Sequence, residues 1–399
     1  MTSAVTPAHP TQRYASLDGL RGAAALVVVA THILVVIPAV SAVIWRHEEP
    51  PVGSGAWLLF RTPLVVLTLG DQAVMIFFIM SGFVLALSLL RGPQTPRGTL
   101  GYFGRRLVRL YLPVWASLIL ASLLATIVVR EKFGSEWLAS HPRPDLHIVL
   151  RDAILVMGTS NLNSPLWSLT WELWFSLLLP VIIALYRLMR VQRWWVGFVA
   201  LLVVASLSSR LPIMAELPLA WLSRPLLQYM PIFVLGVVLA ERRNSIAAWA
   251  SHLPRRCWLP AWIVTAAMLL VPPMLLPIGD ARPAVFLWGC EIVAAAAVVF
   301  LAIHHPRSAS LLESRPMTWL GRRSFSLYLT HEPLIVSAAL LLGAIAWWPW
   351  LGWAVLLLPV ILLVAALFFR WVEAPSHALA RWVGRRIERS SSRSRVIQS

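Results

Sequence analysis

Residues 16–33, SLDGLRGAAALVVVATHI, have the composition of a helix that spans a membrane, yet they include three ionisable side chains. Asp18 and Arg21 stand at the start of the segment, and His32 follows Arg21 after ten intervening residues. A charged side chain at the centre of a bilayer costs about 2.5 kcal/mol or more, so such residues need a partner or a function. We therefore expect this segment to combine a membrane-spanning helix with part of a functional site.

The whole chain has the composition of an integral membrane protein. Of its 399 residues 59% are hydrophobic and 13% are charged, which is more apolar surface than one soluble core can bury. Ten apolar runs, separated by short stretches that contain arginine, have about the length that crosses about 30 Å of hydrocarbon. The predicted spans cover residues 20–44, 72–90, 107–129, 165–186, 194–207, 226–240, 258–276, 284–303, 324–345 and 350–371. The predicted fold class is all-α, a polytopic integral membrane protein with about ten transmembrane helices.

The arginines predict the orientation of these helices. If the N-terminus is cytoplasmic, the inner connections are rich in arginine and the outer ones are nearly balanced in charge, as the positive-inside rule requires. Both termini are therefore predicted to be cytoplasmic, and most of the net charge of +17 serves orientation and contact with bilayer lipids. Nucleic acid is not expected as a partner, because no soluble basic domain is present. We expect residues 1–15 and a basic tail over residues 384–399 to be disordered, on either side of a membrane domain over residues 16–383.

Arg21 and His32 are the first candidate site residues. A rise of 1.5 Å per residue places His32 about 16 Å deeper than Arg21, near the bilayer midplane. Their spacing is close to three turns, so both side chains share one face of the helix. This geometry suits an elongated anionic ligand whose charged end stays at the membrane surface. The alternative is a histidine bonded to a neighbouring helix and an arginine that snorkels to the headgroups.

Glu172 is the second candidate, in PLWSLTWELWFSLLLP at residues 165–180. If its helix enters from the outside, the carboxylate lies about 10 Å down, at a depth that approaches that of His32. An unpaired carboxylate there would be unfavourable. We therefore expect a partner such as His32 or an arginine, or else a water-filled cavity. A purely structural ion pair is the alternative.

The third candidate is an arginine cluster, Arg105, Arg106 and Arg109, in FGRRLVRLYLP at residues 103–113. Arg105 and Arg109 are one helical turn apart and share a face. Guanidinium groups so arranged match phosphate oxygens. The positive-inside rule alone would also place arginines here, so the cluster has two explanations.

Four further residues are possible supporting members of a site. Tyr328 and His331 are one turn apart in the ninth predicted span, and Glu373 stands at the inner end of the tenth. Glu373 would otherwise simply end its helix, and Asp18 would cap the first helix or pair with a nearby arginine. The two cysteines show no metal-ligand spacing, so no metal site is predicted.

Six segments, taken together and in order, resemble the signature segments of the acyltransferase-3 family of bacterial integral-membrane acyltransferases. They are LDGLRGAAALVVVATHI, FFIMSGFVLAL, RRLVRLYLP, PLWSLTWELWF, SFSLYLTHEPL and WVEAP. The resemblance covers residues 14–382, nearly the whole chain. It implies a multi-pass protein of the bacterial inner membrane that moves an acyl group, commonly acetyl, from cytoplasmic acyl-CoA to a hydroxyl. The acceptors in that family are carbohydrates, lipid-linked glycans or macrolide-type molecules.

The resemblance also implies roles for the candidate residues. Arg21 and His32 fall on the arginine–histidine pair of the family, and Glu172 falls on its glutamate. The family's arginine cluster falls on Arg105, Arg106 and Arg109. The implied roles are phosphate binding by the arginines and general-base catalysis or transient acylation of His32. Glu172 would orient His32.

Two other functions fit some of the same residues. In a proton-coupled transporter or flippase, His32, Glu172 and His331 would form a proton relay across the bilayer. A non-catalytic membrane scaffold would leave these three ionisable groups unexplained.

Overall fold

The computed structural model describes residues 14–91, 95–130, 134–191, 194–216, 219–278, 281–342 and 347–389. These residues form helices and connections, and no β-strand occurs among them. Nine helices in the described ranges are long and apolar enough to cross a membrane. The prediction of an all-α polytopic membrane protein is therefore confirmed.

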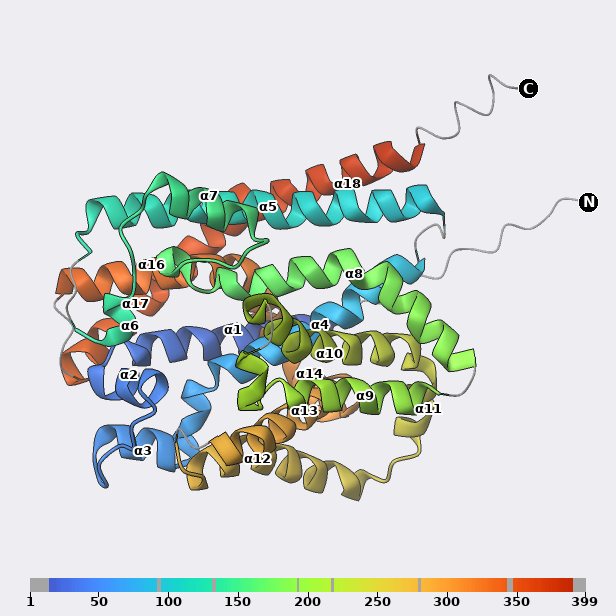
Figure 1. Cartoon of the computed structure of the whole chain (residues 1–399), viewed down its shortest axis with the longest axis horizontal. Helices are drawn as coiled ribbons and strands as arrows, with labels where there is room; N and C mark the ends of the chain where they lie inside the picture. The colour runs from blue at the N-terminus through green and yellow to red at the C-terminus, as the bar shows by residue number, and fades with distance from the viewer. Residues whose placement is uncertain are drawn as a thin grey trace, which may run out of the picture.

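The long helices pack side by side in one bundle (Figure 1). They are α1 Ala15–Val35, α4 Gly70–Arg91, α5 Pro96–Ile127, α8 Leu166–Val191, α10 Ala220–Glu241, α12 Trp258–Leu275, α13 Ala281–His304, α16 Ser324–Leu342 and α17 Trp347–Phe368. The π-helix Phe369–Glu373 joins α17 to α18 Ala374–Arg389 without a break. The shorter helices are α2 Pro38–Trp45, α3 Gly55–Arg61, α6 Glu136–Ala139, α7 Leu146–Ile154, α9 Trp195–Ser208, α11 Arg243–Ser251, α14 Pro306–Leu312 and α15 Arg315–Arg322. Single 3-10 turns lie at Pro63–Thr68, Asn161–Asn163, Pro212–Ala215 and Arg255–Cys257.

The two ends of the bundle differ in character. Tyr14, just before α1, and Arg385 of α18 line one hollow, so the described chain begins and ends on the same side of the bundle. We call this side the arginine-rich end. The opposite side, where α2, α3 and α6 lie in Figure 1, is called the loop end.

One predicted span is shorter than expected. In place of the fifth span the structure has α9, whose 14 residues reach only about 21 Å. The predicted count of ten is thus nine long helices and α9. The helix still completes the alternation, because Arg187 near the end of α8 bonds Glu241 at the end of α10, at 3.0 Å. From the end of α8 the chain crosses the bundle along α9 and crosses back along α10, so α8 and α10 end side by side.

Two predicted boundaries were wrong. The first predicted span, residues 20–44, is divided into α1 and α2, because Ile37 takes an extended conformation before Pro38, as residues that precede proline do. At the other end of the chain, residues 384–389 are helical within α18 rather than a disordered tail. Residues 1–13 and 390–399, for which disorder was also predicted, lie outside the described residues.

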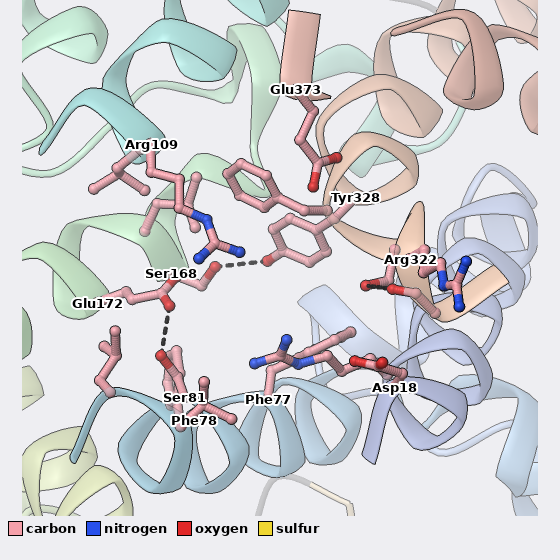
Figure 2. A pocket seen from close by; sticks show the side chains of 18 of the residues that line it. Asp18, Phe77, Phe78, Ser81, Arg109, Ser168, Glu172, Arg322, Tyr328 and Glu373 are labelled. Atoms are coloured by element: carbon pink, nitrogen blue, oxygen red, sulfur yellow. Dashed lines mark hydrogen bonds between the residues drawn. The ribbon is translucent and has the colours of Figure 1, made fainter. Parts of the chain in front are cut away.

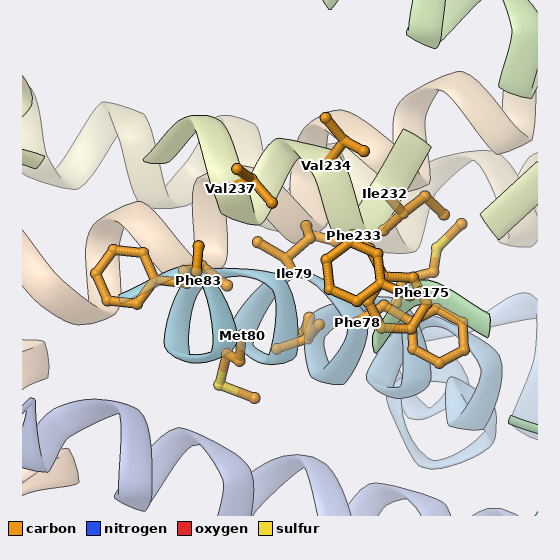
Figure 3. Packing of buried hydrophobic residues seen from close by; sticks show 14 of the residues in the cluster. Phe78, Ile79, Met80, Phe83, Phe175, Ile232, Phe233, Val234 and Val237 are labelled. Atoms are coloured by element: carbon orange, nitrogen blue, oxygen red, sulfur yellow. The ribbon is translucent and has the colours of Figure 1, made fainter. Parts of the chain in front are cut away.

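The core is built where α4 crosses α10 at very short range. A Cβ atom added to Gly82 would lie 2.0 Å from the carbonyl oxygen of Phe233, and one added to Gly236 would lie 2.1 Å from that of Ile79. Phe233 also stacks on Phe78, with ring centroids 4.3 Å apart (Figure 3). Glycine at both positions therefore lets the two backbones approach, and this fixes α4 among the helices that carry the site.

Arg61 of α3 ties the loop end together. Its Nη1 donates to the carbonyl oxygens of Met274 at 3.0 Å and Leu276 at 2.8 Å, where α12 ends. Its Nη2 bonds the Glu49 carboxylate, which also accepts the Ile278 N–H at 2.7 Å. The Arg61 hydrogen bond holds the pKa of Glu49 below its ordinary value, and the Ile278 N–H adds to this effect.

Replacement of Arg61 by alanine is expected to destabilise the protein by about 2 kcal/mol, because it removes charge-assisted hydrogen bonds to carbonyls at a helix end. Thermal unfolding in detergent measures this loss. Arg46→Ala is the matched control, since the Arg46 side chain is 51% exposed. Because the pKa of Glu49 is lowered in the folded protein, its carboxylate contributes stability that is fully present above the unfolded pKa of about 4.3. This contribution is lost as the pH falls through the lower pKa of the folded state. If the Glu49→Gln variant lost as much stability on acidification as the wild type does, this assignment would be contradicted.

Candidate active site

Two histidines and a carboxylate meet toward the loop end of the bundle. Nε2 of His331, on α16, lies 3.3 Å from Nδ1 of His32, on α1, and the two ring centroids are 4.9 Å apart. On its other side, Nε2 of His32 lies 3.3 Å from Oε2 of Glu332. The structure thus brings two predicted residues, His32 and His331, into contact and adds Glu332.

The hydrogen bonds of the two rings assign their protons. Nδ1 of His331 lies 2.9 Å from the Leu327 carbonyl oxygen, which can only accept, so this nitrogen carries a proton and Nε2 is free to accept. Nδ1 of His32 faces that acceptor and the Val28 carbonyl oxygen at 2.8 Å, so it carries a proton as well. In the neutral ring, the basic nitrogen of His32 is therefore Nε2, which faces Glu332.

Glu332 is fully buried and is held from several directions. Its carboxylate accepts the N–H of Ser164 at 2.8 Å and the hydroxyl of Ser164 at 2.5 Å. It also accepts from Nε2 of His141 at 2.9 Å. Nδ1 of His141 faces the Trp137 carbonyl oxygen at 2.8 Å. His141 is thus a buried hydrogen-bond partner of Glu332 close to His32.

Sequence reasoning missed this group in part. Glu332 follows His331 directly in the middle of an apolar helix, and a carboxylate in that position was a usable signal. His141 and Ser164 lie in connections between long helices, where no periodic pattern marks them.

The segment around α6 covers the histidines. The Trp137 ring lies 5.7 Å from the His32 ring, and the Trp137 N–H donates to the Ser41 hydroxyl at 3.2 Å. His32 keeps 18% of its side chain exposed, whereas His331 and Glu332 are buried. His32 is therefore the member of this group that a substrate can reach.

His32 lies closer to the end of its helix than predicted. Val35, where α1 ends, is only three positions further along, which is about 4.5 Å of helix. The neighbouring Thr31 packs on Gly70, where α4 begins; a Cβ atom on Gly70 would lie 3.0 Å from its hydroxyl oxygen. His32 therefore lies toward the loop end rather than half-way along α1.

A cavity of about 420 Å³ lies within the bundle, with Asp18, Arg109 and Tyr328 among the residues around it (Figure 2). The residues that line it come from α1, α4, α5, α8, α15, α16, the π-helix and α18. Its charged lining residues are Asp18, Arg21, Arg106, Arg109, Glu172, Arg322 and Glu373. Three of the four predicted arginines thus face one space, together with predicted acidic residues. Four guanidinium groups against three carboxylates leave the lining cationic, which suits an anionic ligand.

Glu172 belongs to this cavity and not to the histidine group. Its Oε1 lies 2.6 Å from Nη2 of Arg106 and accepts the Ser81 hydroxyl at 2.6 Å. Nε of Arg106 donates to the Ser176 hydroxyl at 2.9 Å. The expected contact of Glu172 with His32 is therefore wrong, and its expected pairing with an arginine is correct. The depth estimate failed because α8 begins at the level of Ser164, which already contacts Glu332.

Arg105 points away from this cavity. It pairs with Glu388 of α18 and lines a second hollow of about 630 Å³ at the arginine-rich end. The other arginines of that hollow are Arg21, Arg91, Arg109, Arg381 and Arg385. Since Arg21 and Arg109 line both spaces, the hollow adjoins the cavity. Arg91, Arg381 and Arg385 had been interpreted from sequence only as orientation signals.

Tyr328 stands between the cavity and the histidines. Its hydroxyl donates to the Pro165 carbonyl oxygen at 3.0 Å and lies 2.7 Å from the Ser168 hydroxyl (Figure 2). Its ring lines the cavity, and the ring centroid is 6.0 Å from that of His331. His32 is not among the described residues that line the cavity, whereas Tyr328 both lines it and contacts the histidine group.

Glu373 does not end its helix, as one interpretation of the sequence had it. It closes the π-helix and accepts the Ser326 N–H at 3.1 Å and the Ser326 hydroxyl at 2.5 Å. The carboxylate faces the cavity in Figure 2. A π-helix is often found at functional sites, and here it turns a carboxylate inward.

Comparisons with known proteins identify the family. A family model described as an acyltransferase domain, that of acyltransferase-3, matches residues 14–370. Acyltransferase MdmB of Streptomyces mycarofaciens is 29% identical over 362 residues, which are 83% of this chain and 81% of the relative. Peptidoglycan O-acetyltransferase OatA of Listeria monocytogenes serovar 1/2a (strain ATCC BAA-679 / EGD-e) is 30% identical over 101 residues, 25% of this chain and 16% of the relative. No solved structure matches. A multi-pass membrane protein with this match is a membrane acyltransferase, and the chain belongs to the acyltransferase-3 family.

Proposed function

We propose that this protein transfers an acyl group, acetyl in the simplest case, from acyl-CoA to a hydroxyl of a carbohydrate, lipid-linked glycan or macrolide-type acceptor. One observation carries the proposal. The cationic cavity ends at Tyr328, whose ring lies 6.0 Å from that of His331, and His331 touches His32. An anion-binding space and a basic imidazole thus adjoin across one side chain.

The arginine-rich end suits the donor. Coenzyme A has several phosphates at one end and a thioester on a flexible arm of about 15–20 Å, close to the rise of about 16 Å between Arg21 and His32. Arg105 and its neighbours in the hollow would bind the nucleotide phosphates. Arg21, Arg106 and Arg109 would hold the diphosphate and the start of the arm. For the thioester to reach His32, the Tyr328 ring has to move aside.

His32 would act as the general base. Its Nε2 takes the proton of the acceptor hydroxyl while the oxygen attacks the thioester carbonyl carbon. A C–O bond forms, the C–S bond breaks, and coenzyme A leaves as a thiolate that takes the proton from His32. Glu332, whose Oε2 lies 3.3 Å from that same Nε2 of His32, would stabilise by its charge the imidazolium that exists between these two proton transfers.

Glu172 has a different role in this proposal. Because it bonds Arg106 and Ser81 within the cavity, it would position the Arg106 guanidinium for the donor rather than orient His32. Asp18 and Glu373 would balance the arginine charges when the cavity holds no donor.

The proposal includes the orientation of the protein in the bacterial inner membrane. The arginine-rich end would face the cytoplasm, where acyl-CoA is made, in agreement with the positive-inside rule. The histidine group would then lie in the outer half of the bundle, where an exported acceptor can reach it.

Arg109→Ala is expected to raise the KM for acetyl-CoA at least about tenfold, since it removes a charge that lines both donor spaces. Steady-state thiol release from acetyl-CoA in detergent measures it. Arg187→Ala is the control, because Arg187 lies at the same end but pairs with Glu241. An unchanged KM for acetyl-CoA in the Arg109 variant would contradict the proposal that this cavity binds the donor.

A further inference from the structure

A second group of polar side chains lies at the loop end and takes no part in the mechanism above. We call it the Asp71 cluster. It consists of Asp71 and Gln72 at the start of α4, Arg210 after α9, Tyr229 on α10, and Trp288 and Glu291 on α13. Nε2 of Gln72 donates to Oε1 of Glu291 at 2.6 Å, and the Arg210 guanidinium lies 4.2 Å from the centroid of the Trp288 ring. The charges of Asp71, Arg210 and Glu291 act on one another.

Packing alone does not explain this cluster. Glu291 lies in the middle of a helix long enough to span the membrane, and its hydrogen-bond partner is an amide, not a cation. A carboxylate so placed is unfavourable and marks a functional site by default. Asp71 lies in the first turn of α4, where a negative charge stabilises the helix, but this does not account for Glu291 or Arg210.

The cluster is open and close to the proposed base. Asp71 is exposed, and Arg210, Tyr229 and Glu291 are half-buried, so the cluster is not sealed within the core. Gly70, next to Asp71, packs on Thr31, next to His32, and the charge of His32 acts on Asp71. A molecule bound at the cluster would therefore have one part beside His32.

The chemistry of the cluster favours a neutral, polyhydroxylated ring. The two carboxylates are balanced by Arg210 and by Arg224, which donates from Nε to the Ser209 carbonyl oxygen at 3.0 Å. Carboxylate, amide and guanidinium groups together both accept and donate hydrogen bonds, as sugar hydroxyls require. The half-buried ring of Tyr229 adds an apolar surface for the C–H groups of a sugar, and the buried Trp288 ring, with its centroid 6.1 Å away, packs beside it.

We propose that the Asp71 cluster binds the sugar ring of a neutral glycoside acceptor and presents one of its hydroxyls to Nε2 of His32. This inference rests on the proposed acyl transfer and adds to it the place and the class of the acceptor. The bond changes are those of that transfer: the acceptor oxygen gains the acyl group, and its proton passes to His32.

The test uses the full-length protein in detergent with acetyl-CoA and four probe acceptors. These are methyl β-D-glucopyranoside, a methyl 6-deoxyhexopyranoside, methyl glucosaminide as a cationic sugar, and 1-octanol as a hydroxyl without a ring. Acetylated product is measured by mass spectrometry. We expect transfer to the neutral glycosides. Asp71→Asn and Glu291→Gln, which keep the side-chain volume, are each expected to raise the glycoside KM about tenfold without changing the KM for acetyl-CoA.

Glu216→Gln is the matched control, because Glu216 is an exposed carboxylate in the connection between α9 and α10. It should leave both KM values unchanged. Failure of both cluster variants to change the glycoside KM overturns the inference, and so does transfer to 1-octanol or only to the cationic sugar. Hydrolysis of acetyl-CoA without transfer to any glycoside also overturns it but leaves the donor site intact. Absence of any thiol release by the wild type contradicts the proposed function itself.

Discussion

Replacement of His32 by alanine is expected to lower the rate of acyl transfer from acetyl-CoA at least about a thousandfold, within the range for loss of a general base. The physical reason is the position of Nε2, which is the basic nitrogen of the ring and belongs to the accessible member of the group. His331 cannot replace it, because its ring is fully buried and its Nε2 is directed at His32. Thiol release and acetylated product, measured together, follow the reaction.

His147→Ala is the matched control, because His147 is an exposed histidine of α7. It should retain the wild-type rate. A His32→Ala variant that folds, binds acetyl-CoA and still transfers acetyl at a rate within a few-fold of wild type would exclude His32 as the base. Passage of the acceptor across the membrane without a covalent change would instead support the transporter function.

The second large effect is expected for Glu332→Gln, which should lower kcat about a hundredfold. The substitution keeps the shape of the side chain but removes the charge that faces Nε2 of His32, so the imidazolium formed during transfer loses its stabilising partner. The KM for acetyl-CoA should stay unchanged, because among the described lining residues of the donor cavity Glu332 is not included.

The separation of kcat from KM distinguishes this role from a structural one. His141→Gln alters another hydrogen-bond partner of the buried Glu332 carboxylate without touching His32, so it should lower thermal stability more than kcat. A Glu332→Gln variant with an unchanged kcat and a raised KM for acetyl-CoA would contradict the assignment.

The sequence predicted most of the fold because the length of an apolar run decides whether a helix can span the bilayer. It failed where local chemistry interrupts an apolar run. Residues 20–44 remain apolar past Pro38, but the residue before proline leaves the helical conformation, and α1 ends at Val35. The continuation of α17 into α18 past Pro375 was also missed, because the π-helix that joins them leaves no mark in hydropathy.

The site residues that lie on the long helices could be predicted, because an ionisable side chain in an apolar helix is visible in the sequence. Arg21, Arg106, Arg109 and Glu172 do face one cavity. The start of α8 was predicted within one residue, but its level relative to His32 was not, so of the two expected partners of Glu172 the structure has an arginine, Arg106, and not His32.

Glu332 itself gave a usable signal in its helix, but its partners could not be predicted. Glu332 is held by Ser164 and His141, and both come from connections whose packing only tertiary structure defines. The same is true of the Asp71 cluster, whose members come from three long helices and the connection that follows α9.

The most direct test of a donor that passes from the arginine-rich end to His32 is a cryo-electron microscopy structure with a non-hydrolysable acetyl-CoA analogue, in which a methylene group replaces the sulfur. We expect its phosphates against Arg21, Arg105 and Arg109, the Tyr328 ring displaced, and the acetyl carbonyl within reach of Nε2 of His32. An analogue bound at the loop end, or one whose acetyl group stops on the arginine side of an unmoved Tyr328, would contradict the mechanism.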